Sequence, residues 1–162
     1  MKCLQTVVSF VLLALVLHTA SAEVVSFQKC PDKSTEKCTI HEVSYRPCPE
    51  AAEGNPCLVY RGTNVSITFD FTPNFNANEL TADVSWTRPL YDLPYVDMDT
   101  TACKHTNCPV VSGNRQTYTY AMPIKKGYFL QDYDIKWKLA SENGDACCFI
   151  IKIKIVKKKR RT

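Results

Sequence analysis

The cysteines are the residues of this sequence whose type and number most directly suggest chemistry. There are nine, and each thiol could ligate a metal, act as a nucleophile or form a disulfide. Zinc sites usually contain a CxxC pair or add histidines at short spacing. No CxxC pair is present, and after residue 22 the histidines are His41 and His105, neither placed like a ligand partner. The spacing therefore favours disulfides over a metal centre.

The first 22 residues indicate the compartment in which these cysteines react. Lys2 gives a positive start, the run VVSFVLLALVL is apolar over eleven residues, and small residues follow at Ala20-Ser21-Ala22. This pattern predicts a secretory signal peptide over 1–22, because the apolar run is shorter than the roughly 20 residues of a transmembrane helix. We therefore expect a secreted protein, found outside the cell or in the endolysosomal lumen.

Removal of the signal peptide would leave eight cysteines, an even number in an oxidising compartment. We therefore expect four disulfides, although eight cysteines allow roughly a hundred pairings and their spacing selects none of them. The eight are Cys30, Cys38, Cys48, Cys57, Cys103, Cys108, Cys147 and Cys148.

Motifs of enzymes are missing from the sequence. It contains no GxSxG nucleophile elbow, no HExxH motif and no glycine-rich phosphate loop. We therefore expect no enzymatic activity, no cofactor and no metal. Asn64-Val65-Ser66 is a glycosylation sequon that secretion makes usable, so Asn64 is a candidate glycosylation site.

Basic residues gather at the C-terminus. The formal net charge is +4, and the run 157–161 alone carries five positive charges. The rest of the mature chain is therefore slightly negative, which argues against a nucleic-acid-binding face, since such a face spreads Lys and Arg over a patch. Three interpretations of the basic tail 157–162 stay open: a solvated terminus, a segment attracted to anionic membranes, or a protease processing site.

Strands are the elements that must position these residues. Apolar and polar residues alternate along most of the mature chain, so each strand has one face that must be buried. With no amphipathic helix to cover these faces, two antiparallel sheets must face each other. We predict one all-β domain over 23–156, an immunoglobulin-like β-sandwich of seven to eight strands. The expected strands lie near 39–46, 65–71, 80–86, 118–122, 133–139 and 149–155.

The segment 88–109 interrupts this pattern. It is long and contains three prolines, so we expect it to run irregularly between the sheets. Long loops of this kind are often functional.

Several motifs, taken in their order along the chain, resemble the ML (MD-2-related lipid-recognition) family over residues 24–156. Within that family they resemble the arthropod-type, Niemann–Pick type C2-like secreted carriers. The resemblance implies a sandwich whose sheets separate to form an internal lipid pocket. The motifs are FQKC, the PC…PC-x4-G stretch over 47–62, the C-x4-CP stretch over 103–109, TYTYAMPIKKGY, IKWKL and CFIIKIKIV.

The resemblance also implies a disulfide pairing. At the first cysteine, Lys29-Cys30-Pro31 stands where the family often has Asp-Cys-Gly. The implied bridges are Cys30–Cys148, Cys48–Cys57 and Cys103–Cys108, with the two additional cysteines, Cys38 and Cys147, joined as a fourth.

The resemblance further implies which residues contact a ligand. The family's sterol-contacting aromatic residue falls on Tyr95, where phenylalanine is usual, and two further contacts fall on Ile124 and Tyr128. Tyrosine makes the pocket mouth more polar, so fatty acids and other amphiphiles stay open beside cholesterol. We expect this mouth at the loop 91–95 and the turn 126–128. The other residues expected to line the pocket or the core are Phe69, Phe71, Tyr118, Tyr120, Trp137 and Ile153.

These implications predict a secreted monomer that binds and transports a sterol, a fatty acid or a similar semiochemical, with transient membrane contact and no nucleic acid. Two alternatives stay open. One is an innate-immunity protein that recognises microbial lipids such as lipopolysaccharide. The other is an adhesion or signalling sandwich with a filled core and no ligand.

Overall fold

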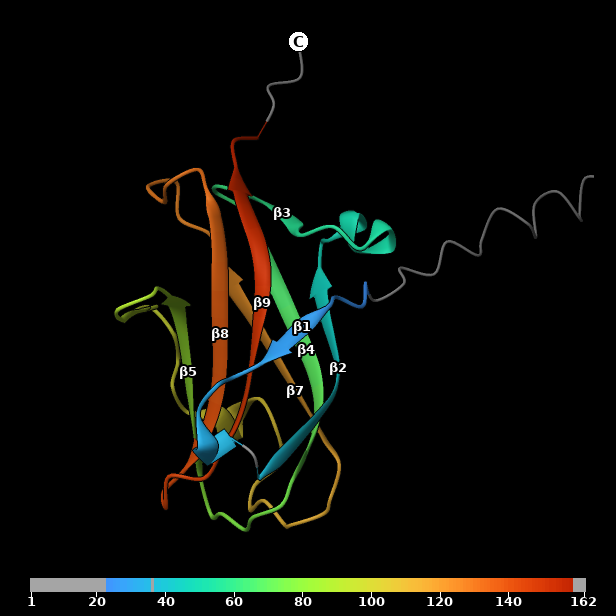
Figure 1. The fold of residues 1–162 in the computed structure, drawn as a ribbon, viewed down its shortest axis with the longest axis vertical. Helices are drawn as coiled ribbons and strands as arrows, with labels where there is room; N and C mark the ends of the chain where they lie inside the picture. The colour runs from blue at the N-terminus through green and yellow to red at the C-terminus, as the bar shows by residue number, and fades with distance from the viewer. Residues whose placement is uncertain (1–22, 36, 159–162) are drawn as a thin grey trace, which may run out of the picture.

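Nine strands form two facing sheets in the computed structural model, which describes residues 23–35 and 37–158 (Figure 1). The predicted signal peptide and residues 159–162 of the basic tail lie outside the described residues. No helix within the described ranges is long and apolar enough to cross a membrane. Three short 3-10 turns, η1 (Lys33–Thr35), η2 (Pro49–Glu53) and η3 (Ala102–Lys104), lie between strands.

The larger sheet has six strands. Its path is β1-β9-β8-β5-β6, and β3 also pairs with β9. All pairs are antiparallel except β3 with β9, which is parallel. The strands are β1 (Phe27–Lys29), β3 (Cys57–Tyr60), β5 (Leu80–Thr87), β6 (Asp92–Pro94), β8 (Asp132–Ser141) and β9 (Ala146–Val156).

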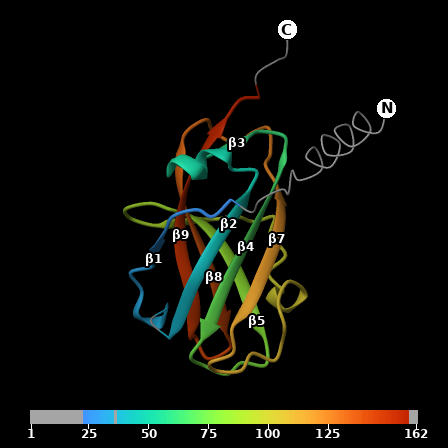
Figure 2. The same cartoon turned by 90° about the vertical axis from the view of Figure 1, so that its right-hand side faces the viewer.

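The smaller sheet has the order β2-β4-β7 and is entirely antiparallel. In Figure 2 it lies in front of the long strands of the larger sheet. Its strands are β2 (Cys38–Arg46), β4 (Asn64–Pro73) and β7 (Gln116–Pro123). The predicted two-sheet, all-β sandwich is therefore confirmed.

The predicted count of seven to eight strands is too low, because the described residues contain nine. The strands β1, β3 and β6 have only three or four residues each, too few for a clear alternation of apolar and polar residues. The expectation that 88–109 runs irregularly is wrong at β6, which pairs with β5 at the edge of the larger sheet. Pro94 ends that strand, which agrees with the confinement of proline to sheet edges.

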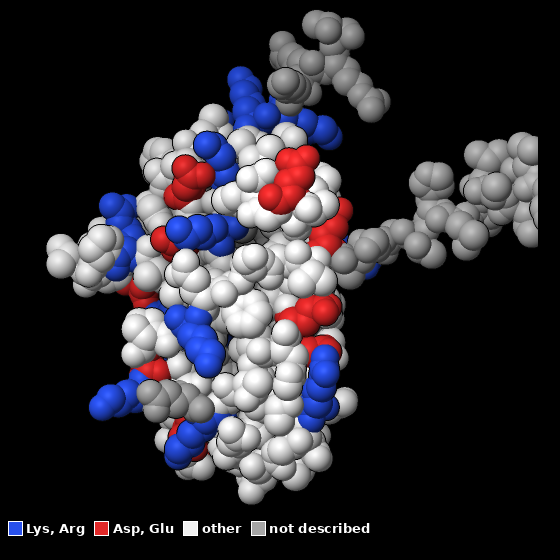
Figure 3. Space-filling view, turned by 45° about the vertical axis from the view of Figure 1, so that its right-hand side comes forward, with Lys and Arg blue, Asp and Glu red and all other residues white. Residues whose placement is uncertain are grey.

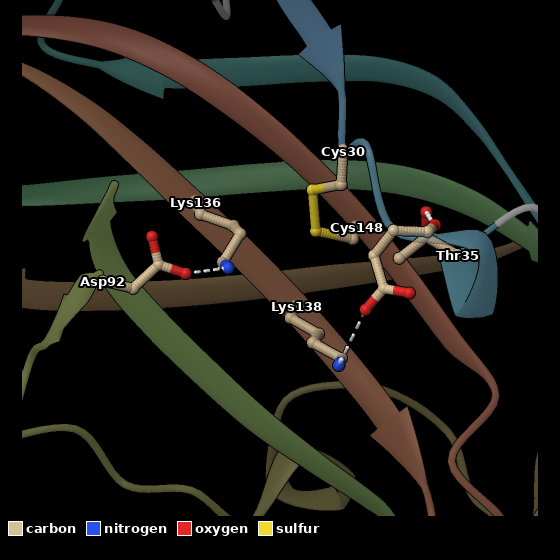
Figure 4. The surroundings of a disulfide bond; sticks show 7 residues. Cys30, Thr35, Asp92, Lys136, Lys138 and Cys148 are labelled. Carbon is tan, nitrogen blue, oxygen red and sulfur yellow. Dashed lines mark hydrogen bonds and ion pairs between the residues drawn. A yellow bond between two sulfur atoms is a disulfide. The ribbon is translucent and has the colours of Figure 1, made fainter. Parts of the chain in front are cut away.

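Strand β9 shows how the sequence pattern produces the sandwich. Phe149, Ile151, Ile153 and Ile155 are buried between the sheets, while the lysines between them are exposed. On the outer face of the neighbouring β8, the ammonium group of Lys136 pairs with the carboxylate of Asp92. The ammonium nitrogen of Lys138 lies 3.9 Å from a carboxylate oxygen of Asp32 (Figure 4). These lysines are therefore partly neutralised by nearby carboxylates.

Acidic and basic side chains are mixed on the surface shown in Figure 3. Neither sign forms a continuous patch on that face, and a band of uncharged side chains runs along its middle.

Aromatic rings fill one half of the space between the sheets. Phe69 of β4 lies at the centre, with ring centroids 5.1 Å from Tyr118, 6.3 Å from Trp137 and 4.8 Å from Phe149. These four side chains come from both sheets, and each is at most 2% exposed. Burial of such large side chains is the main force that holds the two sheets together.

Disulfides join the chain at four places. The bridge between Cys38 of β2 and Cys147 of β9 links the two sheets covalently. A neighbouring bridge joins Cys148 to Cys30, just after β1 (Figure 4). The bonded pairs are those that the family resemblance implies: Cys30–Cys148, Cys38–Cys147, Cys48–Cys57 and Cys103–Cys108.

We predict that the two neighbouring bridges to β9 are partly redundant. Either one alone closes a loop of more than a hundred residues, so the second then closes only a ring of about ten residues. Replacing Cys30 and Cys148 by serine, or Cys38 and Cys147, should each lower the free energy of unfolding by roughly 3 kcal/mol, and replacing all four by roughly 7–8 kcal/mol. Urea denaturation of the three variants measures these losses.

Removal of the Cys103–Cys108 bridge is the control. It closes a separate short loop, so its loss should add to that of either β9 bridge. If the loss of the fourfold variant equalled the sum of the losses of the two double variants, the two β9 bridges would not be redundant.

Candidate ligand cavity

A cavity of about 400 Å³ occupies the half of the sandwich that the aromatic rings do not fill. Its side walls are the inward residues of β5, β8 and β9 on one sheet and of β2 and β7 on the other. The strand residues that line the cavity are Tyr45, Val84, Ser85, Trp86, Met122, Tyr133, Ile135, Trp137, Ile151, Ile153 and Ile155, with Leu93 and Pro94 of β6.

Trp137 forms the boundary between the cavity and the aromatic core. It lines the cavity, and its ring also packs 6.2 Å from Tyr118 and 6.0 Å from Tyr120. Among the predicted ligand contacts on strands, Trp137 and Ile153 reach the cavity. Phe69, Phe71, Tyr118 and Tyr120 do not line it, and belong to the filled core.

The three residues that the family resemblance singles out, Tyr95, Ile124 and Tyr128, all line the cavity, and we call this part of the lining the mouth because the exposed lining residues Leu93, Val96 and Phe129 adjoin it in the sequence. The Tyr95 hydroxyl donates a hydrogen bond of 3.2 Å to the carbonyl oxygen of Pro123, and its ring meets that of Tyr128 edge to face at 6.5 Å. Burial is the main cause that raises the pKa of Tyr95 to about 12, and the proximity of Tyr128 and Asp97 contributes to this rise. Both Tyr95 and Tyr128 therefore remain neutral hydroxyls at physiological pH, since burial also raises the pKa of Tyr128.

One ion pair also lies at the mouth. The ammonium group of Lys125 contacts the carboxylate of Asp97, and both residues line the cavity. Lys125 comes from the loop after β7 and Asp97 from the segment after β6, so the pair joins the two sheets across the mouth. Because both side chains remain substantially exposed, the pair contributes little to stability.

The loop after β7 is anchored at its base and near its tip. The backbone N–H of Ile124 donates to the Thr63 carbonyl at 2.8 Å, and the guanidinium of Arg61 donates to the Tyr128 carbonyl at 2.9 Å. Gly127 lines the cavity, but its φ is not positive, so its backbone conformation does not require glycine.

Exposed apolar side chains lie on the segments 90–96 and 129–130, which contribute to the cavity lining, and we call them the apolar rim: Leu90, Tyr91, Leu93, Val96, Phe129 and Leu130. Three of the six, Leu93, Val96 and Phe129, also line the cavity. Leu90 is 92% exposed, Val96 84% and Phe129 75%. Two other large apolar side chains are exposed in the described chain, Val24 and Val111. Such a concentration of exposed apolar side chains beside a cavity is typical of an interaction surface.

Sequence reasoning missed much of the cavity wall. The alternation identifies Trp86, Tyr133 and Ile135 as inward-facing, but it does not tell which half of the sandwich a residue occupies, so they were not predicted as ligand contacts. Tyr45 was missed for another reason, since β2 contains an irregularity between Ile40 and Glu42 that breaks its alternation.

The arrangement can bind but offers little for catalysis. The cavity lining includes one carboxylate and one ammonium, which pair with each other, and no cysteine or histidine. Asn64 of the glycosylation sequon is exposed at the start of β4, outside this lining, and its modification stays a prediction.

Comparison with known proteins identifies the family. The family model described as "ML domain" matches residues 24–155. The MD-2-related lipid-recognition protein of Manduca sexta is 35% identical over 152 residues, which cover 90% of this chain and 95% of the relative. The mite group 2 allergen Eur m 2 of Euroglyphus maynei is 24% identical, over 70% of this chain and 79% of the allergen.

A solved structure supports the fold. The crystal structure of a Niemann–Pick type C2 protein from Japanese carpenter ant superimposes with a TM-score of 0.71 at 17% identity, covering 81% of this chain and 99% of that protein. From the family match and the sequence identity to its relatives, this chain is a member of the ML domain family of lipid-recognition proteins.

Proposed function

We propose that this protein is a secreted carrier that holds one hydrophobic ligand, such as a fatty acid or a sterol, in the cavity between its sheets. The observation that supports this most directly is the cavity of about 400 Å³, whose walls are almost entirely aliphatic and aromatic. This volume falls within the range of roughly 300–1,000 Å³ that is usual for small-molecule sites.

Transfer of the ligand would be nearly balanced between protein and membrane. Each buried CH₂ group contributes about 0.8 kcal/mol, so a sixteen-carbon chain gains roughly 12–13 kcal/mol on leaving water. A bilayer offers almost the same gain, so the protein can both load and unload without any chemical step. Passage through the mouth then limits the rate.

The apolar rim is our candidate for transient membrane contact. It surrounds the route by which a ligand would leave, and insertion of its side chains into a bilayer would let a ligand pass between two apolar phases. Lys125 and Lys126 follow Ile124 at this mouth and are compatible with an anionic lipid surface.

Recognition of a microbial lipid is the second candidate. It is considered because the relative from Manduca sexta is named a lipid-recognition protein. The volume of about 400 Å³ favours one chain or one sterol over a lipid with many acyl chains.

Organic extraction of the secreted protein followed by mass spectrometry tests the proposal. We expect one class of single-chain lipid or sterol at near-equimolar amount, and uptake of a fluorescent fatty acid that this lipid displaces. Tight binding of lipid A without binding of single-chain lipids would favour the second candidate. No bound lipid and no uptake would favour the ligand-free sandwich.

Replacing Ile124 by tryptophan should block uptake while leaving the fold intact. Ile124 is only 5% exposed and its backbone is fixed to the β3–β4 turn, so a larger side chain must extend into the cavity. Displacing even three methylene groups of a ligand loses about 2.4 kcal/mol, or roughly fiftyfold in affinity. Fluorescent fatty acid titration measures the affinity, and circular dichroism checks the fold.

Ile124→Ala is the matched control for this substitution. It enlarges the cavity and should retain uptake, which separates steric blocking from loss of the isoleucine contact. Unchanged uptake by Ile124→Trp would count against this placement of the ligand.

Leu90→Asp should slow transfer to vesicles without changing equilibrium affinity. Leu90 is 92% exposed on the rim and does not line the cavity. Loss of its burial in the bilayer, together with the added negative charge, should reduce the transfer rate about tenfold. Stopped-flow transfer of a fluorescent fatty acid to anionic vesicles measures this rate.

Val111→Asp is the control, since Val111 is an exposed apolar side chain outside both the rim and the cavity lining. Equal transfer rates for the two variants would contradict a membrane role for the rim.

A further inference from the structure

Tyr45 places a hydroxyl in the wall of a cavity whose lining is mostly aliphatic and aromatic. Its side chain points between the sheets from β2, lines the cavity and is 2% exposed. Three polar side-chain atoms of the described chain are fully enclosed without a hydrogen-bond partner, on Thr87, Tyr118 and Trp137. The Tyr45 hydroxyl is not one of them, and it takes part in none of the side-chain hydrogen bonds found among the described residues, so it is not fully enclosed; the space that its side chain lines is the cavity.

Among the residues that the structure describes, no hydrogen bond or charge compensates the burial of this hydroxyl. Burial alone raises the pKa of Tyr45, with no contribution from a hydrogen bond or a neighbouring charge. At the mouth, by contrast, Tyr95 donates a hydrogen bond to Pro123. A buried hydroxyl without a partner is unfavourable, so a ligand that supplies the partner gains free energy that a purely apolar ligand does not.

Tyr45 lies on the side of the cavity away from the mouth. The smaller sheet has the order β2-β4-β7, so β4 separates Tyr45 from β7, which leads into the mouth residues Ile124 and Lys125. Strands are about 4.8 Å apart, so the backbones of β2 and β7 are separated by roughly 10 Å. The polar groups of the mouth and the Tyr45 hydroxyl therefore face the cavity from opposite sides.

We propose that the preferred ligand carries oxygen at both ends: a polar headgroup at the mouth and a second hydroxyl or carbonyl oxygen that forms a hydrogen bond with Tyr45. A chain with a terminal hydroxyl, or a sterol hydroxylated on its side chain, has this chemistry. This inference rests on the proposed function, since it assigns a specificity-determining residue to the same cavity.

The test compares two fatty acids of nearly equal shape, omega-hydroxypalmitic acid and heptadecanoic acid, in which a methyl group replaces the terminal hydroxyl. The wild-type protein should bind the hydroxylated acid about three- to tenfold more tightly, the net effect of one hydrogen bond. Tyr45→Phe removes only the phenolic oxygen and should reverse this preference, because the ligand hydroxyl is then buried without a partner. Competition against a fluorescent fatty acid measures all four affinities.

Tyr118→Phe is the matched control. Its hydroxyl is also buried without a partner but lies outside the cavity lining, so the substitution should leave the preference of the wild type unchanged. If Tyr45→Phe does not fold, the wild type alone still tests the inference, because equal affinities for the two acids would overturn it.

The outcomes separate this inference from the proposed function. Equal affinities, or a preference for heptadecanoic acid, on the wild-type protein would overturn the role of Tyr45 and leave the carrier function standing. A preference that persists in Tyr45→Phe would overturn it as well. Failure of the wild type to bind either acid or any extracted lipid would overturn both.

Discussion

Covalent closure along one edge of the sandwich is the constraint on which the rest of the structure depends. The Cys38–Cys147 bridge joins β2 of the smaller sheet to β9 of the larger one, and Cys48–Cys57 joins the segment after β2 to β3, the neighbour of β9. Along the opposite edge the sheets meet only through non-covalent contacts, such as that of Tyr95 with Pro123. Of the two edges, the one at β2, β3 and β9 is therefore the one that disulfides fix.

Unequal filling of the space between the sheets follows from side-chain size. Facing sheets lie about 10 Å apart, a gap that stacked aromatic rings can bridge. Around Phe69 the rings of Tyr118, Trp137 and Phe149 do so, and the core there is closed. Towards the other end of β9 the inward residues are isoleucines, which are smaller than Phe149, and they line the cavity that remains. The end of the sandwich that contains the cavity is thus stabilised by the closed aromatic end, because the same strands run through both.

The sequence predicted the faces of the strands well but not their positions along the sandwich. Alternation of period two places Phe69, Tyr118, Trp137 and Ile153 inward, and all four are buried. It cannot tell that Phe69 and Tyr118 belong to the closed core while Trp137 and Ile153 reach the cavity, because this depends on strand register across two sheets. The mouth residues came from family resemblance, since loops carry no periodicity that marks a binding site.

Apolar burial explains why such a cavity holds a lipid, but it does not explain selectivity. Every hydrocarbon chain gains nearly the same free energy per methylene group, in the cavity as in a bilayer. Discrimination must therefore come from the few polar groups of the lining, because leaving one of them unpaired is unfavourable in a dry site. Tyr95 and Tyr128 remain neutral, so they can recognise a headgroup by hydrogen bonds without adding charge to the mouth. Under the proposed function, the cavity size limits how much lipid is bound, and the placement of hydroxyl groups decides which lipid it is.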